Sequence, residues 1–169
     1  MIKSAPDLQK QHQILIYGYG NPGRQDDGLG NHFVEMAREW AAEQGLKNIA
    51  VDSNYQLNIE DAAEITGKDI VIFVDASLED IDDFVLDEIT PDAKVEFSMH
   101  AVSASYVVHL CKEIYPQCPA AWLLHLKGYE WEFREGLTEQ ALNNCQKAFE
   151  YLKPILINPQ QLLKHQQKH

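Results

Sequence analysis

Two adjacent carboxylates, Asp26 and Asp27, lie at the end of a glycine-rich turn in the stretch ILIYGYGNPGRQDDGLG at residues 14–30. The apolar residues before the turn predict a buried strand over 13–17, and helical spacing of apolar residues predicts a helix over 31–44. Ligands of parallel α/β sheets bind outside the carboxyl ends of the strands, where this turn lies. Carboxylates at such a position suit a metal cation, so the pair marks a candidate metal site.

The glycines allow a second interpretation, which is a dinucleotide site. The first three glycines of the turn fit the G-x-G-x-x-G pattern, and Asp52 ends a second predicted strand like a ribose ligand. We disfavour this site because two carboxylates would repel a pyrophosphate, which needs bare backbone N–H groups. The helix also begins near Asp27, too late for the third glycine to pack it against the strand. In a simpler alternative, Asp26 or Asp27 caps the helix and the other carboxylate is left for chemistry.

The elements that must position these carboxylates alternate along the chain. Apolar runs predict strands over 48–52, 69–75 and 122–126 and a charged edge strand, which we expect to be antiparallel, over 82–90; helical patterns cover 59–65, 101–115 and 138–152. Pro154 should close or kink the last helix. Phe33, Val34 and Trp40 share one face of the first helix and should be buried. This order predicts a three-layer α/β/α fold with a doubly wound, mostly parallel sheet.

The 169 residues form a single predicted domain, with a core over about 13–157 and loose termini at 1–12 and 158–169. The formal net charge is −12, which disfavours nucleic-acid binding because affinity for phosphate backbones comes largely from Lys and Arg. Seven acids and no base lie within 79–92, which we interpret as a solvated face rather than a partner site.

The three cysteines, Cys111, Cys118 and Cys145, are odd in number and widely spaced. This pattern argues against a disulfide framework or a cysteine zinc site and fits a reducing cytoplasm. Residues 1–13 lack the apolar core of a signal peptide, and no apolar run is long enough to span a membrane. We therefore expect a cytoplasmic monomer that contacts neither membrane nor nucleic acid.

Three predicted strands deliver an acid to one edge of the sheet: Asp27 follows the first, Asp52 the second and Asp75 the third. His100 lies just before the helix over 101–115 and could reach the same crevice. Asp27, Asp75 and His100 would supply two carboxylate oxygens and one imidazole nitrogen, a donor set that suits nickel or zinc. As an isolated histidine, His100 would more simply cap its helix.

These motifs together resemble the hydrogenase maturation endopeptidases, which trim the C-terminal extension from the large subunit of nickel–iron hydrogenases. The matching motifs are GYGNPGRQDDGLG at 18–30, VIFVDA at 71–76, SMH at 98–100 and GLT at 136–138, all between residues 13 and 152. The resemblance implies a phosphorylase/hydrolase-like fold. It also implies that Asp27, Asp75 and His100 contact the metal.

The resemblance further implies that cleavage follows nickel insertion into the precursor, so that the metal is carried by the substrate and no organic cofactor is needed. Nickel could polarise the scissile carbonyl or activate a water, and a carboxylate could act as base. No G-x-S-x-G motif indicates a covalent nucleophile. The chain departs from the family pattern after Asp52, where SNYQL replaces a glycine pair and a threonine. This change leaves the hydrogenase subclass open, and Asp52 remains a candidate second-site residue.

Other functions fit parts of the sequence. Peptidyl-tRNA hydrolases open with a similar strand and G-x-G-N-P-G turn, but RQDD at 24–27 replaces the catalytic histidine motif that should follow. The acidic composition also makes the chain a poor tRNA binder. A non-catalytic module is the other alternative, either a nucleotide sensor, which the doubled aspartate disfavours, or a nickel-binding maturation chaperone with the same three ligands.

Overall fold

The computed structural model describes residues 11–92 and 102–164 of the chain. Strands and helices alternate along these residues, as the apolar periodicity predicted. The strands are β1 (Ile14–Tyr19), β2 (Ile49–Asn54), β3 (Ile70–Ser77), β4 (Phe84–Glu88) and β5 (Ala120–Lys127). The helices are the short 3-10 helix η1 (Gln25–Gly28), α2 (Leu29–Gln44), α3 (Asp61–Ile65), α4 (Ala104–Ile114), α5 (Glu139–Ile157) and α6 (Gln160–Lys164).

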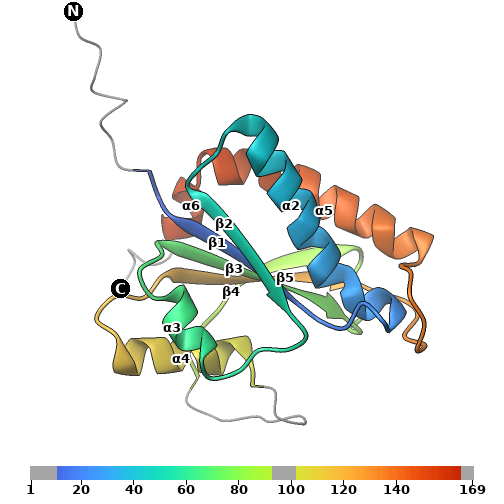
Figure 1. The fold of residues 1–169 in the computed structure, drawn as a ribbon, viewed down its shortest axis with the longest axis horizontal. Helices are drawn as coiled ribbons and strands as arrows, with labels where there is room; N and C mark the ends of the chain where they lie inside the picture. The colour runs from blue at the N-terminus through green and yellow to red at the C-terminus, as the bar shows by residue number, and fades with distance from the viewer. Residues whose placement is uncertain (1–10, 93–101, 165–169) are drawn as a thin grey trace, which may run out of the picture.

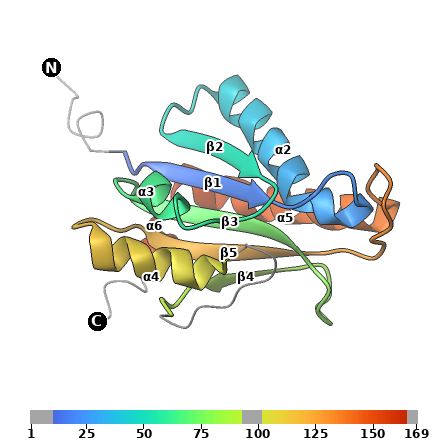
Figure 2. The ribbon, with the colours of Figure 1, turned by 60° about the horizontal axis from the view of Figure 1, so that its bottom comes forward.

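One sheet with the strand order β2-β1-β3-β5-β4 lies between two layers of helices (Figure 1). Strand β1 pairs in parallel with β2 and β3, and β3 pairs in parallel with β5, whereas the edge strand β4 is antiparallel to β5. Helix α4 covers one face, and α2 and α5 cover the other (Figure 2). The predicted three-layer fold is confirmed, including the antiparallel edge strand. The two strands that carry Asp52 and Asp75, β2 and β3, flank β1.

Alternation along the central strands divides the apolar residues between two cores, because successive side chains point to opposite faces of a sheet. Ile14 and Ile16 of β1 join the core beneath α2 and α5, whereas Leu15 and Tyr17 join the core beneath α3 and α4. Both central strands β1 and β3 are therefore apolar on both faces, which requires helices on both sides.

The first helix buries the predicted face only in part. Phe33 and Val34 are fully buried beneath α5, as expected. Trp40 is only partly buried, and its ring meets the edge of Phe149 at a centroid distance of 5.8 Å. The expectation of full burial for Trp40 is wrong because this residue lies near the end of α2, where it covers the rim of the core rather than its centre.

The C-terminal region is more ordered than the sequence predicted. Helix α5 continues through Pro154 to Ile157, since Ile155 and Leu156 remain buried against the sheet beyond the proline. The expectation that residues 158–169 are loose is wrong for the described part, because α6 follows directly. Leu162 of α6 is buried, and its carbonyl accepts a hydrogen bond of 3.0 Å from the Trp122 indole N–H. Nowhere in the described part of the chain does a helix combine the length and apolar character needed to cross a membrane.

Candidate functional site

The glycine-rich turn packs the start of α2 directly onto the sheet. A Cβ atom on Gly18 would collide with the Gly30 carbonyl, and one on Gly30 would collide with the Val74 carbonyl of β3. Gly20 has a φ of +150°, and a Cβ there would meet the backbone carbonyl of Asp27. Only glycine permits these approaches. The contact places Asp27 beside the carboxyl end of β3, and Gly30 rather than the third glycine of the motif packs helix against strand.

Asp26 is fully buried and accepts hydrogen bonds from a segment more than one hundred residues away. Its carboxylate accepts the backbone N–H groups of Tyr129 at 2.8 Å, Glu130 at 3.1 Å and Thr138 at 2.8 Å. The Thr138 hydroxyl donates a fourth hydrogen bond at 2.9 Å. Since these donors occupy its oxygens, Asp26 anchors the segment 128–138 to the turn and is not the carboxylate left for chemistry.

Neither aspartate caps a helix through its side chain, so the capping alternative is wrong. Helix α2 begins at Leu29 with Gly28 as its N-cap, and no side chain completes that cap. Instead, the half-buried Asp27 carboxylate accepts the backbone N–H of Asn21 at 3.0 Å. This hydrogen bond fixes Asp27 within the turn, and the carboxylate accepts no other hydrogen bond from residues 11–92 and 102–164, so its second oxygen is open to a further ligand.

Asp75 lies near the carboxyl end of β3, close enough to Asp27 for the charge of Asp27 to affect its pKa. Burial, and then the negative charge of Asp27, raise the pKa of Asp75 to about 7. Hydrogen bonds from the Ala76 N–H and the Tyr19 hydroxyl lower this pKa, but by less than burial raises it. Burial and the Asp75 carboxylate in turn raise the pKa of Tyr19 well above its usual range. Two of the three predicted site residues therefore lie together at this edge of the sheet.

Asp52 belongs to different surroundings. Its side chain is exposed, and its Oδ1 accepts the N–H of the next residue, Ser53, at 2.8 Å. Its charge contributes to raising the pKa values of Tyr17 and Asp61 rather than that of Asp75. Asp61 is a buried carboxylate that the sequence did not single out, and the Tyr17 hydroxyl donates a hydrogen bond of 2.8 Å to it.

His100, the third predicted residue, lies in 93–101, outside the described residues. The first described residue after it, Val102, donates its N–H to the Leu57 carbonyl at 3.4 Å. Helix α4 is capped by Ser103, whose Oγ accepts the Tyr106 N–H at 3.1 Å, so a capping role for His100 is not needed. Within 11–92 and 102–164, no group of three or more His, Cys, Asp or Glu side chains is placed to hold a metal ion.

His125 is a further histidine near the carboxylate pair. It is the register partner of Asp75 on the neighbouring strand β5. Its Nε2 lies 3.3 Å from Oδ2 of Asp87 on the edge strand β4. Tyr19, Asp75 and His125 therefore come from three adjacent strands. The alternation of side chains along each strand could have indicated that these three residues point to the same face of the sheet. Their proximity, however, follows only from the strand order, which makes β3 and β5 neighbours.

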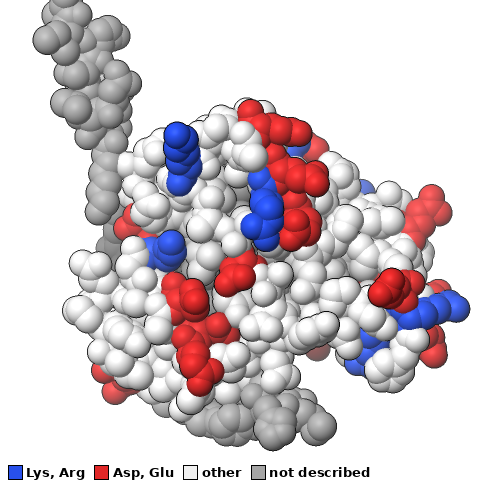
Figure 3. Space-filling view, viewed as in Figure 1, with Lys and Arg blue, Asp and Glu red and all other residues white. Residues whose placement is uncertain are grey.

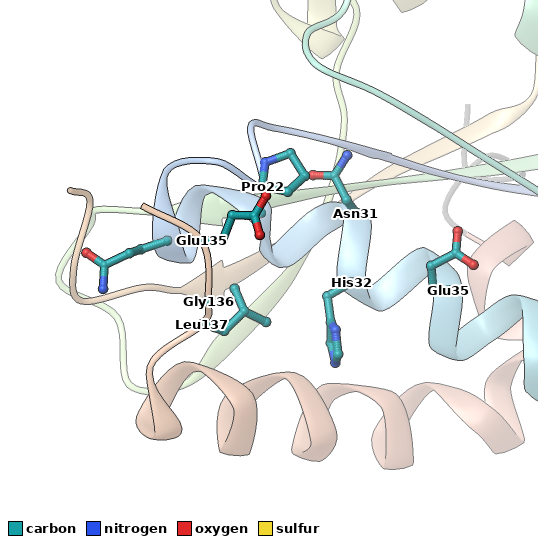
Figure 4. A pocket seen from close by; sticks show the side chains of 9 residues that line it. Pro22, Asn31, His32, Glu35, Glu135, Gly136 and Leu137 are labelled. Carbon is teal, nitrogen blue, oxygen red and sulfur yellow. The ribbon is translucent and has the colours of Figure 1, made fainter. Parts of the chain in front are cut away.

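A cavity of about 410 Å³ opens beside the turn, between the start of α2 and the end of the segment 128–138 (Figure 4). It is lined by Pro22, Gln25, Gly28, Asn31, His32, Glu35, Glu135, Gly136 and Leu137. The Oδ1 atom of Asn31 is buried and has no hydrogen-bond partner among the described residues. Its amide nitrogen donates to the Asn54 carbonyl at 3.3 Å. A buried acceptor without a donor is costly, so this oxygen suits a ligand N–H.

Charge is distributed unevenly over the molecule. Acidic side chains gather over α2 and α3 on the face shown in Figure 3, whereas the end formed by η1 and the segment 128–138 carries both signs. There Arg134 pairs with Glu130 at 3.8 Å, and the Arg24 guanidinium lies 5.3 Å from the centre of the Phe133 ring. This mixed end borders the cavity, which Glu135 of the segment 128–138 helps to line.

The fold is that of the hydrogenase maturation proteases. The protease HycI from Thermococcus kodakarensis KOD1 superposes with a TM-score of 0.69 at 21% identity, over 87% of this chain and 94% of that chain. The endopeptidase HybD from E. coli gives a TM-score of 0.62 at 17% identity, over 87% and 93% of the two chains. A hydrogenase 2 maturation peptidase from Thaumarchaeota archaeon SCGC_AB-539-E09 gives 0.62 at 15% identity, over 85% and 97%.

No protein-family model and no curated protein sequence matches the chain. Because the three structures share at most 21% of their residues with this chain, the comparison establishes the common fold. The predicted resemblance to hydrogenase maturation endopeptidases is thereby confirmed at the level of structure.

Proposed function

We propose that this protein is an endopeptidase that removes the C-terminal extension of a nickel–iron hydrogenase large-subunit precursor after nickel insertion. The observation that carries the proposal is the proximity of Asp27 to Asp75 at the carboxyl edge of the sheet, where the charge of Asp27 helps to raise the pKa of Asp75. The fold shared with three solved maturation proteases supports the same class of activity. His100 is the proposed third contact to the metal.

The carboxylate pair suits a divalent ion that arrives with the substrate. Burial and the negative charge of Asp27 disfavour the ionised form of Asp75, and a pKa of about 7 leaves Asp75 partly protonated near neutral pH. An incoming Ni²⁺ would favour the ionised form of Asp75 and release its proton. Recognition of the substrate would thus be selective for precursor that already carries its metal.

The cavity beside the turn is the proposed place for the polypeptide around the cleavage site. It lies next to Asp27 in the chain's tertiary structure, because Pro22, Gln25 and Gly28 of the same turn line it. The unpaired Asn31 oxygen would accept a backbone N–H of the bound precursor. A backbone contact of this kind would position an extended peptide with little demand on its side chains.

The direct test is to incubate the purified protein with nickel-loaded and with nickel-free large-subunit precursors and to measure precursor mass. A protease shortens the nickel-loaded precursor only. A maturation chaperone would change the metal content of the precursor without shortening it. Turnover of peptidyl-tRNA in a parallel assay, with no change in either precursor, would instead favour the alternative that the protein is a peptidyl-tRNA hydrolase.

Variants then test the residues. Asp27→Asn keeps the size of the side chain and an oxygen for the Asn21 N–H but removes the charge, so processing should be abolished in a folded protein. His100→Ala should have the same effect. Asp52→Asn is the matched control, because Asp52 is exposed and should process precursor normally. Processing by Asp27→Asn at the parent rate would overturn the metal assignment.

A further inference from the structure

Two cysteines that are seven residues apart come into contact at the far end of the molecule from the carboxylate pair. Cys111 lies on the buried face of α4, and Cys118 lies in the connection to β5. Their Sγ atoms are 2.7 Å apart, although both thiols are free. A disulfide needs an S–S distance of about 2.05 Å, so a movement of less than about 1 Å would join them.

The surrounding backbone holds the two thiols in this position. The Tyr115 N–H donates to the Cys111 carbonyl at 2.9 Å, which ends the helix. The Thr66 hydroxyl donates to the Gln117 carbonyl at 2.8 Å and so ties the connection to the end of α3. Prolines at 116 and 119 restrict the backbone on either side of Cys118. The contact between the two thiols therefore lies in a turn whose backbone is held by hydrogen bonds and by two prolines.

We propose that Cys111 and Cys118 form a reversible disulfide, a redox-sensitive modification site that is oxidised by a low-molecular-weight disulfide such as oxidised glutathione. The Cys118 thiolate attacks the small disulfide, forms a mixed disulfide and releases one glutathione thiolate. The Cys111 thiol then loses its proton and attacks Sγ of Cys118, which releases the second glutathione. Two protein thiols are thus oxidised by two electrons, and one glutathione disulfide is reduced to two thiols.

Exposure and acidity decide the order of these steps. Cys111 is fully buried, whereas Cys118 is partly exposed and can meet a small oxidant. Burial and the neighbouring Cys118 raise the pKa of the Cys111 thiol to about 12, so Cys111 is the poorer first nucleophile. Once Cys118 carries glutathione, the adjacent Cys111 sulfur needs only a short approach to displace it.

The bridge would lie away from the proposed metal site. Ala120, two residues after Cys118, pairs with Ile70 at the amino end of β3, whereas Asp75 lies near the carboxyl end of that strand. Oxidation would tie the end of α4 to the start of β5 without contacting Asp27 or Asp75. The inference therefore stands independently of the proposed proteolytic function.

The test is mass spectrometry of the folded protein after exposure to oxidised glutathione. Free thiols are blocked with a maleimide, and the protein is digested with trypsin. Cleavage after Lys112 separates the two cysteines, so the disulfide appears as a linked pair of peptides that end at Lys112 and Lys127. Cys145 is the internal control, because it is fully buried and its Sγ lies 3.7 Å from a thioether sulfur, Met36 Sδ, rather than beside a second thiol.

We expect the linked pair in the parent and in Cys145→Ser, its loss in Cys118→Ser, and its reversal by reduced glutathione. Closing this short loop should raise the melting temperature of the parent by about 5 °C and leave Cys118→Ser unchanged. The proposal is overturned if Cys118 carries glutathione without any linked peptide. A link that forms only in denaturant or between two chains, or a lower melting temperature after oxidation, would overturn it as well.

Discussion

The Asp27 carboxylate lies close enough to Asp75 for its charge to raise the pKa of Asp75, which burial has already raised, to about 7. One residue comes from the turn after β1 and the other from the end of β3. Their proximity depends on Gly30, whose missing side chain lets α2 approach the Val74 carbonyl. The carboxylate pair is thus a product of close helix–strand packing.

Removing one charge of the pair should change the titration of the other. In Asp27→Asn the pKa of Asp75 should fall below 7, because the repulsion that disfavours its ionised form is lost, although burial keeps it above the usual range. Carbon NMR of the Asp75 carboxyl group measures this shift. Asp52→Asn is the control and should leave the pKa of Asp75 unchanged. An unchanged Asp75 pKa in Asp27→Asn would show that the two carboxylates are not coupled.

The raised Asp75 pKa also predicts how stability depends on pH. Between the usual value of 3.8 and about 7, the folded state holds this proton more tightly than the unfolded state, so this group lowers stability as pH rises. Asp75→Asn should therefore be more stable than the parent at pH 8, by a few kcal/mol at most, with little gain near pH 4. Urea unfolding of both proteins at the two pH values measures the difference. A gain that is equal at both pH values would contradict the assignment.

Asp26 should be needed for the fold. Asp26→Ala removes a fully buried carboxylate that accepts the N–H groups of Tyr129, Glu130 and Thr138, and the loss of these hydrogen bonds to a charged group should cost on the order of 3 kcal/mol. Denaturant unfolding measures the loss, and hydrogen exchange should show faster exchange at these three amides. Asp52→Ala removes an exposed carboxylate and should change stability by less than about 0.5 kcal/mol. Equal effects of the two variants would show that Asp26 does not anchor the segment 128–138.

The two aromatic residues of α2 should differ in their contributions to stability. Phe33 is fully buried, so Phe33→Ala should cost roughly 3–5 kcal/mol. Trp40 is only partly buried, and its loss should cost less, about 1–3 kcal/mol, because part of its surface already faces water. Unfolding of both variants under one set of conditions tests the order. A larger loss in Trp40→Ala would place Trp40 in the centre of the core.

The sequence by itself determined the order and type of the main elements, because the spacing of apolar residues is a local signal. It also indicated that Asp27 and Asp75 meet, since parallel strands bring their carboxyl ends to one edge of a sheet. Of the two predictions for Pro154, a helix stop or a kink, the stop is wrong for a physical reason. Burial of Ile155 and Leu156 against the sheet outweighs the local penalty of the proline.

Tertiary structure alone decided which of the two adjacent aspartates is available to a ligand. Asp26 and Asp27 are identical in type, and the local sequence suggested a helix cap for either one. The four groups that donate hydrogen bonds to the Asp26 carboxylate belong to residues that lie between 103 and 112 positions further along the chain. No local sequence pattern could therefore predict these hydrogen bonds. The pKa of Asp75 likewise depends on burial and on a neighbour in another segment. Both properties arise from contacts between distant parts of the chain, which exist only once the helices have packed onto the sheet.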